Sequence, residues 1–244
     1  DDYLHSEEKI VPILVHGDAA IAGQGVVYEV IQMEQLDGYR TGGTIHIVVN
    51  NQVGFTTNYL DGRSSTYCTD VGKTTLSPVF HVNGDDVEAV AQTFLIALEY
   101  RQRFHRDIFI DLLCYRKYGH NEGDEPRFTQ PQLYKAISKH DSVRDIYVDQ
   151  LKNEKIIDAD YVKKLEEEYK EDLSNSLSDS KKDKKAYLTP ILQEEWEGIG
   201  TADKKGMLAD IDTSYDVEKL SAIAEKMTNI PDDKNFMRKV AKLV

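Results

Sequence analysis

The chain has 244 residues and a formal net charge of −13, enough for one large domain or for one domain and part of a second. A hydrophobic content of 40% beside 30% charged residues indicates a packed core rather than disorder. The acidic balance excludes a general nucleic-acid binder, and no apolar run approaches the ~20 residues that span a bilayer. The two cysteines, Cys68 and Cys114, have no CxxC spacing. This pattern suits a reducing compartment and predicts neither a disulfide framework nor a zinc site.

The first ten residues, DDYLHSEEKI, contain no basic, apolar or Arg-rich targeting pattern. We therefore expect no targeting segment here. The chain also starts without Met, so we expect it to be a piece of a larger protein.

The first quarter of the chain predicts strand, turn, helix and strand. The apolar run from Ile10 to Val15 predicts a buried strand, with its first half weakened by Pro12. Gly17 to Gly25 predicts a turn of small residues. A helix is expected to follow, because apolar residues recur at helical spacing at Val26, Val27, Val30, Met33 and Leu36. We expect this helix to end near Gly38. The run TIHIVVNN, Thr44 to Asn51, predicts a second strand that is covered on both faces.

A long polar segment, Gln52 to Ser77, predicts a long loop, and loops of this length in compact domains are usually functional or disordered. PVFHVNGDD then predicts a strand that runs into a turn. The following segment, 86–104, predicts an amphipathic helix capped by Asp85 or Asp86. DIFIDLLCYR predicts a further strand, before a polar loop.

This order of elements predicts an α/β fold, a doubly wound parallel sheet. Ligands of such sheets bind beyond the carboxyl ends of the strands. The three most suggestive segments all lie at predicted strand ends: Gly17-Asp18, Asn50-Asn51 and Tyr115 to Pro126.

From about Leu133 the pattern is helical. The positions Tyr161, Val162, Leu165, Tyr169 and Leu173 predict one amphipathic helix. The run SNSLSDSKKDKK, 174–185, predicts a solvated linker, and 217–227 and 236–244 predict short helices. We expect three regions: an α/β domain at 1–140, a helical extension at 141–178, and at 179–244 a charged linker with a helical segment that leads to a further domain.

The stretch LVHGDAAIAGQG, Leu14 to Gly25, places one carboxylate at the mouth of a strand-to-helix turn. The start of a helix favours anions, above all phosphates. Asp18 is itself an anion and would repel a phosphate unless a cation lay between them. Mg²⁺ fits, because it takes carboxylate and carbonyl oxygens and is shared with substrate phosphates.

A second ligand is expected at the next strand end. Asn51 lies 33 positions after Asp18, about one βαβ passage, and the backbone carbonyl of Val53 could face the same ion. Taken alone, Asp18 could be a helix cap and Asn51 a turn residue. A dinucleotide site is disfavoured because the Gly23-Gln24-Gly25 run has no third glycine at Tyr28. Neither a Walker A sequence nor a GxSxG elbow occurs.

The segments GDAAIAGQG and VVNNQVG together resemble the thiamine diphosphate signature, which begins Gly-Asp-Gly and ends Asn-Asn. With NNQVGFTT, STYCTD, FHVNGDDVEAV, FIDLLCYRKYGHNEGDEP and TQPQLY, the chain resembles the first component of the 2-oxoglutarate dehydrogenase complex. The resemblance is dense over residues 10–150 and looser beyond. Ala19 departs from the general signature, where glycine is frequent.

The resemblance implies the thiamine diphosphate-binding fold, in its diphosphate and Mg²⁺ half. It implies that Asp18 and Asn51 bind Mg²⁺ by side chain, and Val53 by its carbonyl. The Ala19-Ala20 backbone would face the diphosphate. His120 would lie near the diphosphate or, equally, only order its loop. We expect Asp18 to face the surface. The other histidines are expected to be structural or solvated: His5, His16, His46, His81, His105 and His140. Of these, His46 and His81 are expected to be hydrogen-bonded core residues.

By resemblance, the activity is oxidative decarboxylation of 2-oxoglutarate with succinyl transfer to lipoamide, in the tricarboxylic acid cycle. The implied partners are dihydrolipoyl succinyltransferase, through its lipoyl domain, and dihydrolipoyl dehydrogenase, with a homodimer as the assembly. The implied location is the mitochondrial matrix, or the cytoplasm of a bacterium. The catalytic residues are expected outside this stretch. Two alternatives remain: a 2-oxoadipate dehydrogenase or related 2-oxo acid decarboxylase, and a non-catalytic scaffold.

Overall fold

The computed structural model describes residues 6–182 and 195–242. It divides into two units, Asp1–Asp179 and Ser180–Val244, and each is described by itself. Unit 1 contains the sheet and the candidate site.

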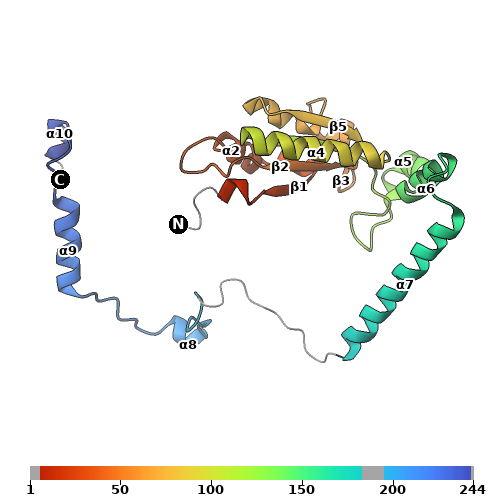
Figure 1. The fold of residues 1–244 in the computed structure, drawn as a ribbon. Helices are drawn as coiled ribbons and strands as arrows, with labels where there is room; N and C mark the ends of the chain where they lie inside the picture. Colours follow the sequence, from red (N-terminus) through yellow and green to blue (C-terminus); the bar gives the residue numbers. More distant parts are fainter. Residues whose placement is uncertain (1–5, 183–194, 243–244) are drawn as a thin grey trace. The chain divides into compact units, whose positions relative to one another are not determined.

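The centre of unit 1 is a four-stranded parallel sheet (Figure 1). Its strands lie in the order β1 (Ile13–Gly17), β2 (Ile45–Asn50), β6 (Ile108–Leu113) and β5 (Val79–Asn83). The register pairs Gly17 with Val49 and Asn50 with Leu113. The carboxyl ends of the central strands therefore meet at one edge, as the sequence predicts for an α/β sheet.

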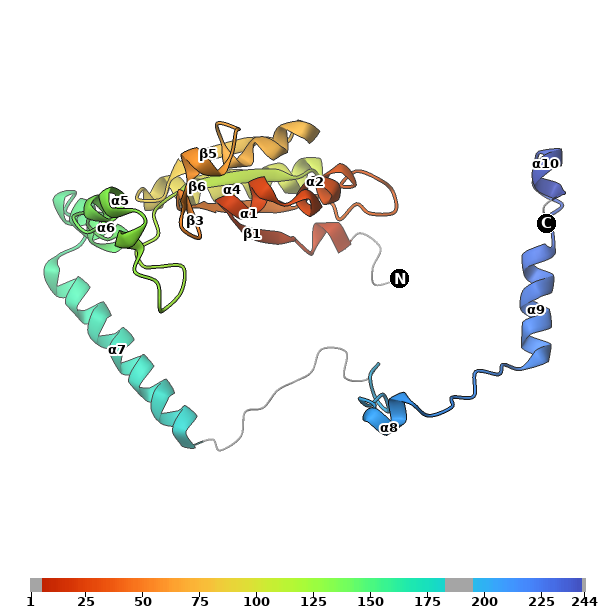
Figure 2. The same ribbon diagram turned by 180° about the vertical axis from the view of Figure 1, so that it is seen from behind.

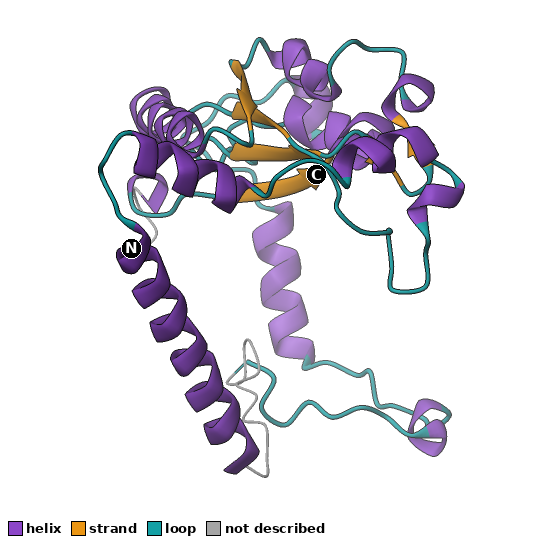
Figure 3. Cartoon of the chain, turned by 90° about the vertical axis from the view of Figure 1, so that its right-hand side faces the viewer, coloured by secondary structure: helices purple, strands orange, loops and turns teal. Residues whose placement is uncertain are grey.

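Helices cover both faces of this sheet. The long helix α4 (Val87–Phe104) packs on the face seen in Figure 1, whereas α1 (Asp18–Gly23) lies over the opposite face in Figure 2, beside α2 (Gly25–Gln32). Figure 3 shows the strands gathered between these helices. Each face has its own core. The core under α1 and α2 contains Ile21, Ile31, Val48, Cys68, Val71 and Phe109, and the core under α4 contains Ile45, Val82, Ala97, Ile108 and Ile110.

The predicted helix 86–104 is confirmed, and its cap is Asp86. The Asp86 carboxylate accepts a hydrogen bond from the Ala89 amide at 2.9 Å, which satisfies one of the free amides of the first turn. Asp85 instead pairs with His140 at 2.9 Å.

Two predictions about the 17–36 stretch are wrong. The segment expected to be a turn of small residues is helix α1, and the following helix ends at Gln32 rather than near Gly38. The buried positions are Ile21 and Ile31, while Val26 and Val30 are exposed. The reason is that α1 and α2 are separate short helices, so one continuous apolar stripe does not describe what they bury.

We expected the polar segment 52–77 to be one long loop, and this prediction is wrong. It contains the hairpin β3 (Val53–Gly54) and β4 (Thr57–Asn58), the short helix α3 (Tyr59–Gly62) and the 3-10 helix η2 (Cys68–Thr75). The helix η2 packs against Phe109 of β6, where a Cβ on Gly72 would lie 2.8 Å from the Phe109 ring. Tertiary packing therefore orders a segment whose composition is that of a loop.

The remainder of unit 1 is helical, as predicted. It contains η3 (Pro126–Phe128), α5 (Pro131–Ile137), α6 (Val143–Asn153) and α7 (Ala159–Lys182), and η1 (Ser6–Glu8) precedes the sheet. The expected linker at 174–185 is wrong over 174–182, which continues α7, and 183–185 lies outside the described residues. The sequence of α7 has no Gly or Pro. Lys-Glu pairs four residues apart also support the helix, at 4.0 Å for Lys163–Glu167 and 3.7 Å for Lys164–Glu168.

The described part of unit 2 contains α8 (Lys204–Met207), α9 (Val217–Thr228) and α10 (Arg238–Ala241). The predicted helix 217–227 is confirmed, whereas the one at 236–244 is shorter than expected within the described residues. No helix of the described chain is both long and apolar enough to cross a membrane.

One buried cation joins α4 to the start of the chain. Arg101 is 0% exposed, and its guanidinium donates to the carbonyl oxygens of Gly43 at 2.8 Å and of Thr41 and Ile10 at 3.1 Å each. It also donates to the carbonyl of Glu7. One side chain thus satisfies four backbone acceptors.

Candidate cofactor and metal site

Asp18 lies at the first position of α1, directly after β1. The helix cap is Gly17, and no side-chain cap bond is formed. Asp18 is only 2% exposed, so the expectation that it faces the surface is wrong. Burial raises the pKa of the Asp18 carboxyl above its ordinary value, although nearby Arg63 and the local backbone amides oppose this shift. A buried carboxylate with a raised pKa needs further positive charge to be stable as an anion.

Arg63 supplies part of that charge. Its Nη1 lies 3.3 Å from Oδ2 of Asp18, and the Arg63 side chain is 9% exposed. The Nε of Arg63 is buried and has no hydrogen-bond partner among the described residues. Asp18 and Arg63 both line a cavity of about 310 Å³, between α1 and the segment that contains β3, β4 and α3.

At the same cavity, β3 approaches α1 closely. A Cβ built on Gly54 would lie 2.5 Å from the Cβ of Ala19, closer than two carbon atoms can pack. The methyl group of Ala19 thus occupies the space beside Gly54. Ala19 lines the cavity, whereas Ala20 is not among the lining residues.

Asn51 and Val53 form a tight turn at the end of β2. The Oδ1 of Asn51 accepts a long hydrogen bond from the Val53 amide at 3.4 Å, and Gln52 between them has a left-handed φ of 67°. The preceding Asn50 donates to Asp111 at 3.0 Å, while its own Oδ1 is buried without a partner among the described residues. The side chain of Asn51 is therefore engaged in turn chemistry, with a weak bond that leaves acceptor capacity on the same oxygen.

The structure brings β3 and α1 together, and Val53 belongs to β3. Asp18 and the turn after Asn51 thus lie at the same edge of the sheet, as their spacing predicts. The roles of these residues toward a metal stay predictions.

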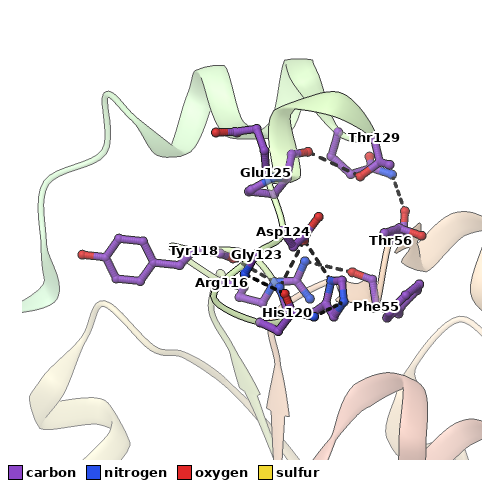
Figure 4. A network of polar contacts seen from close by, with 12 residues as sticks. Phe55, Thr56, Arg116, Tyr118, His120, Gly123, Asp124, Glu125 and Thr129 are labelled. Atoms are coloured by element: carbon purple, nitrogen blue, oxygen red, sulfur yellow. Dashed lines mark hydrogen bonds and ion pairs between the residues drawn. The ribbon is translucent and has the colours of Figure 1, made fainter.

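His120 lies in the loop after β6 and orders that loop (Figure 4). Its Nδ1 is 2.9 Å from Oδ2 of Asp124, and the Asp124 carboxylate also accepts from the His120 amide at 3.2 Å. The His120 ring packs on Phe55, with ring centroids 4.0 Å apart. Because Phe55 directly follows Gly54, His120 lies next to the hairpin that lines the Asp18 cavity.

Arg116 and Gln130 fasten the same loop to the hairpin. The Nη2 of Arg116 donates to the Phe55 carbonyl at 2.9 Å, and Gln130 donates to the Thr56 carbonyl at 3.1 Å. The loop beyond β6 and the hairpin after β2 therefore form one hydrogen-bonded layer at the carboxyl edge of the sheet. A larger cavity of about 890 Å³ is lined by His120 and other residues of 117–140.

The remaining histidines are structural or exposed, with one correction. His46 is buried and lies between His16, at 3.0 Å, and Asp107, at 3.2 Å, which confirms a hydrogen-bonded core histidine. His81 binds Asp111 at 2.8 Å, but its side chain is 42% exposed, so it is not a core residue. The reason is that β5 is an edge strand of the sheet. His5 lies outside the described residues.

Asp18 lines the cavity, whereas Asn51 and Val53 are not among its lining residues. The oxygens of these three residues are nevertheless of the kind that a hard divalent cation takes. The described residues contain no cluster of three His, Cys, Asp or Glu side chains that could hold a metal. An ion here would therefore use one carboxylate, an amide oxygen and a backbone carbonyl, together with oxygens of its ligand. Such sparse protein ligation is typical of Mg²⁺ that is shared with phosphates.

Comparison with known proteins identifies the family. The family described as "Dehydrogenase E1 component" matches residues 5–189. The chain belongs to this family. It is 46% identical over 238 residues to a 2-oxoglutarate dehydrogenase E1 component of Azotobacter vinelandii, a match that covers 97% of this chain and 25% of the relative.

Two further relatives have similar names. A 2-oxoglutarate dehydrogenase E1 component of Brucella anthropi is 40% identical over 99% of this chain and 24% of its own length. A mitochondrial 2-oxoglutarate dehydrogenase of Schizosaccharomyces pombe is 42% identical over 98% of this chain and 24% of its own length. The chain thus spans about a quarter of the length of these E1 relatives.

Sequence reasoning missed Arg63, the ion-pair partner of Asp18. One signal was present in the sequence: Arg63 is the sole Lys or Arg between Arg40 and Lys73. A single cation inside a long polar segment is a candidate for an internal ion pair.

Proposed function

We propose that this chain is the diphosphate- and Mg²⁺-binding part of a thiamine diphosphate-dependent 2-oxoglutarate dehydrogenase, with the thiamine diphosphate-binding fold. The observation that carries the proposal is the buried, incompletely neutralised Asp18 beside a cavity at the carboxyl edge of the sheet. Membership of the E1 family and the names of its relatives support the same assignment.

In this proposal, Asp18, Asn51 and the Val53 carbonyl hold Mg²⁺, and the Ala19-Ala20 backbone and His120 lie toward the diphosphate. The bound cofactor supplies the carbon nucleophile and the electron sink for decarboxylation. This chain's residues bind and orient: they neutralise the diphosphate through the metal and keep the loop after β6 against the hairpin. They act as anchors and not as acids or bases.

The proposed reaction is oxidative decarboxylation of 2-oxoglutarate with transfer of the succinyl group to lipoamide. Its partners would be dihydrolipoyl succinyltransferase, through the lipoyl domain, and dihydrolipoyl dehydrogenase, and the enzyme would be a homodimer. The relatives named 2-oxoglutarate dehydrogenase include a bacterial and a mitochondrial protein. We therefore propose the mitochondrial matrix or the bacterial cytoplasm as the location of this enzyme.

The test is a titration of the full-length enzyme with thiamine diphosphate at saturating Mg²⁺. Asp18→Asn removes the carboxylate charge but keeps the shape of the side chain. We expect cofactor affinity to fall by about 100-fold or more, because even residues that only support metal ligands are worth about 10- to 100-fold in metal affinity. The matched control, Asp37→Asn, changes an exposed carboxylate and should leave the affinity unchanged. Equal affinity of the Asp18→Asn and wild-type enzymes would contradict the metal assignment.

A further inference from the structure

The cavity beside Asp18 contains an arginine with an unused donor. Arg63 is more than nine-tenths buried, one of its terminal nitrogens lies 3.3 Å from Asp18, and its Nε has no partner among the described residues. A buried N–H without an acceptor is costly. Arg63 lines the cavity itself, so an oxygen of a bound group could satisfy this donor.

The ion pair of Asp18 and Arg63 neutralises Asp18 only in part. The oxygen–nitrogen distance of 3.3 Å is at the long end for a charge-assisted bond. A divalent cation would neutralise this carboxylate more completely, and it would release the guanidinium from it.

Tyr59 keeps Arg63 at the cavity even without Asp18. The guanidinium carbon lies 5.4 Å from the centre of the Tyr59 ring, within the range of a cation–π contact. Tyr59 and Arg63 begin and end the same short helical segment, since Arg63 is the C-cap of α3. An arginine released from Asp18 would therefore remain beside the cavity, with its planar fork free to bind a phosphate oxygen.

We propose that Arg63 has two successive partners in this site: the Asp18 carboxylate when metal is absent, and an oxygen of the cofactor diphosphate when Mg²⁺ holds Asp18. This inference rests on the proposed function. Arg63 is then both a stand-in for the metal in the free protein and a positioning residue for the diphosphate in the loaded one.

The two roles predict opposite effects of removing the arginine. Arg63→Met keeps much of the side-chain volume and removes its charge. Without a competing cation, Asp18 should bind Mn²⁺ more tightly in the absence of cofactor, by at least about fivefold. Thiamine diphosphate at saturating Mg²⁺ should bind about 10- to 100-fold more weakly, because a hydrogen bond to a charged group is lost.

The experiment uses the full-length enzyme and two binding measurements. Electron paramagnetic resonance of Mn²⁺ measures the free ion without cofactor, and a fluorescence titration measures thiamine diphosphate. The matched control is Arg103→Met, which removes an exposed arginine of α4 and should change neither affinity. Arg63→Lys keeps a cation but loses Nε, so it should bind Mn²⁺ like the wild type and thiamine diphosphate more weakly.

The outcomes separate this inference from the proposed function. Wild-type enzyme that binds no thiamine diphosphate with Mg²⁺ would overturn the proposed function. Wild-type binding with a parallel loss of both affinities in Arg63→Met would overturn the inference alone, because a purely structural role predicts that loss. If Arg63→Met fails to fold by circular dichroism, Arg63→Lys decides: unchanged thiamine diphosphate affinity in that variant overturns the diphosphate contact.

Discussion

At the scale of the residue, two small residues, Ala19 and Gly54, allow β3 to lie close to α1 beside the candidate site. Ala19 stands where the thiamine diphosphate signature frequently has glycine, and its methyl group lies against Gly54. One of the two positions can carry a methyl group, but not both. This arrangement gives a physical reason why the departure from the signature is tolerated.

Gly54→Ala should therefore be destabilising, and adding Ala19→Gly should reverse the effect. A second methyl group forces β3 away from α1, which we expect to lower the free energy of unfolding by about 1–3 kcal/mol. Urea denaturation of the full-length single and double variants measures this. Simple addition of the two single effects, without recovery in the double variant, would show that the two side chains do not share this space.

The two cysteines should resist alkylation to different degrees. Burial, together with nearby Asp111, raises the pKa of the Cys68 thiol to about 12, and burial with nearby Asp18 raises the pKa of Cys114 to about 11. At pH 8 both remain thiols, which are poor nucleophiles. We expect native protein to react slowly with iodoacetamide, Cys114 before the fully buried Cys68, and rapidly after unfolding. Mass spectrometry of modified peptides would detect the reverse order, which would contradict these environments.

At the scale of the element, α4 is held to the sheet by more than its apolar face. Ala97 is buried in the core, but Arg101 of the same helix is also fully buried and binds four backbone carbonyls. The sequence predicts α4 as amphipathic, and a buried charge on it does not follow from that pattern. The carbonyls that Arg101 binds belong to segments far away in the sequence.

Arg101→Met should lower the free energy of unfolding by about 2–3 kcal/mol, since the buried carbonyl of Gly43 and three part-buried carbonyls lose their donor, and a buried acceptor without a donor costs about 1–3 kcal/mol. Chemical denaturation of the full-length protein measures this loss. Arg103→Met, two positions along the same helix and exposed, should change the stability little. A similar loss in both variants would mean that the effect comes from α4 itself and not from the buried carbonyl contacts.

At the scale of the whole molecule, the chain represents about a quarter of its E1 relatives. Its sheet leaves apolar residues of the edge strand β1 exposed, with Ile13 at 46% and Val15 at 67%. By the resemblance, the groups that activate the aminopyrimidine of the cofactor and bind the substrate carboxylates lie outside these residues. We propose that the candidate site is one half of a larger one.

The isolated chain, residues 1–244, should accordingly show no 2-oxoglutarate decarboxylation, whereas the full-length enzyme should be active with the same cofactor and Mg²⁺. Reduction of ferricyanide that depends on 2-oxoglutarate measures the first reaction without the partner components. A rate in the isolated chain close to that of the full-length enzyme would contradict the half-site proposal.

The local pattern of the sequence was sufficient for the sheet and for the ends of its strands. Apolar runs of strand length and the 3.6-residue period of α4 are properties of neighbouring residues, so β2, β5, β6 and α4 were predicted correctly. The first strand was predicted as a buried strand from Ile10, which is wrong: β1 begins at Ile13, and its apolar residues are exposed because it is an edge strand. The placement of Asp18 and Asn51 at strand ends followed from the same pattern. The long polar segment 52–77 was not predictable in this way, because its hairpin and η2 are ordered by packing against α1 and Phe109.

Only the tertiary structure decided what surrounds the carboxylate of Asp18. The ion pair with Arg63 joins residues 45 positions apart, and the Ala19–Gly54 contact joins residues 35 positions apart. Neither contact can be recognised from the periodicity of the sequence, because each depends on how the segment after β2 folds back against the sheet edge. The sequence by itself determined that an acid stands at the end of a parallel strand. The fold decided that this acid is buried, faces an arginine, and lies beside a cavity.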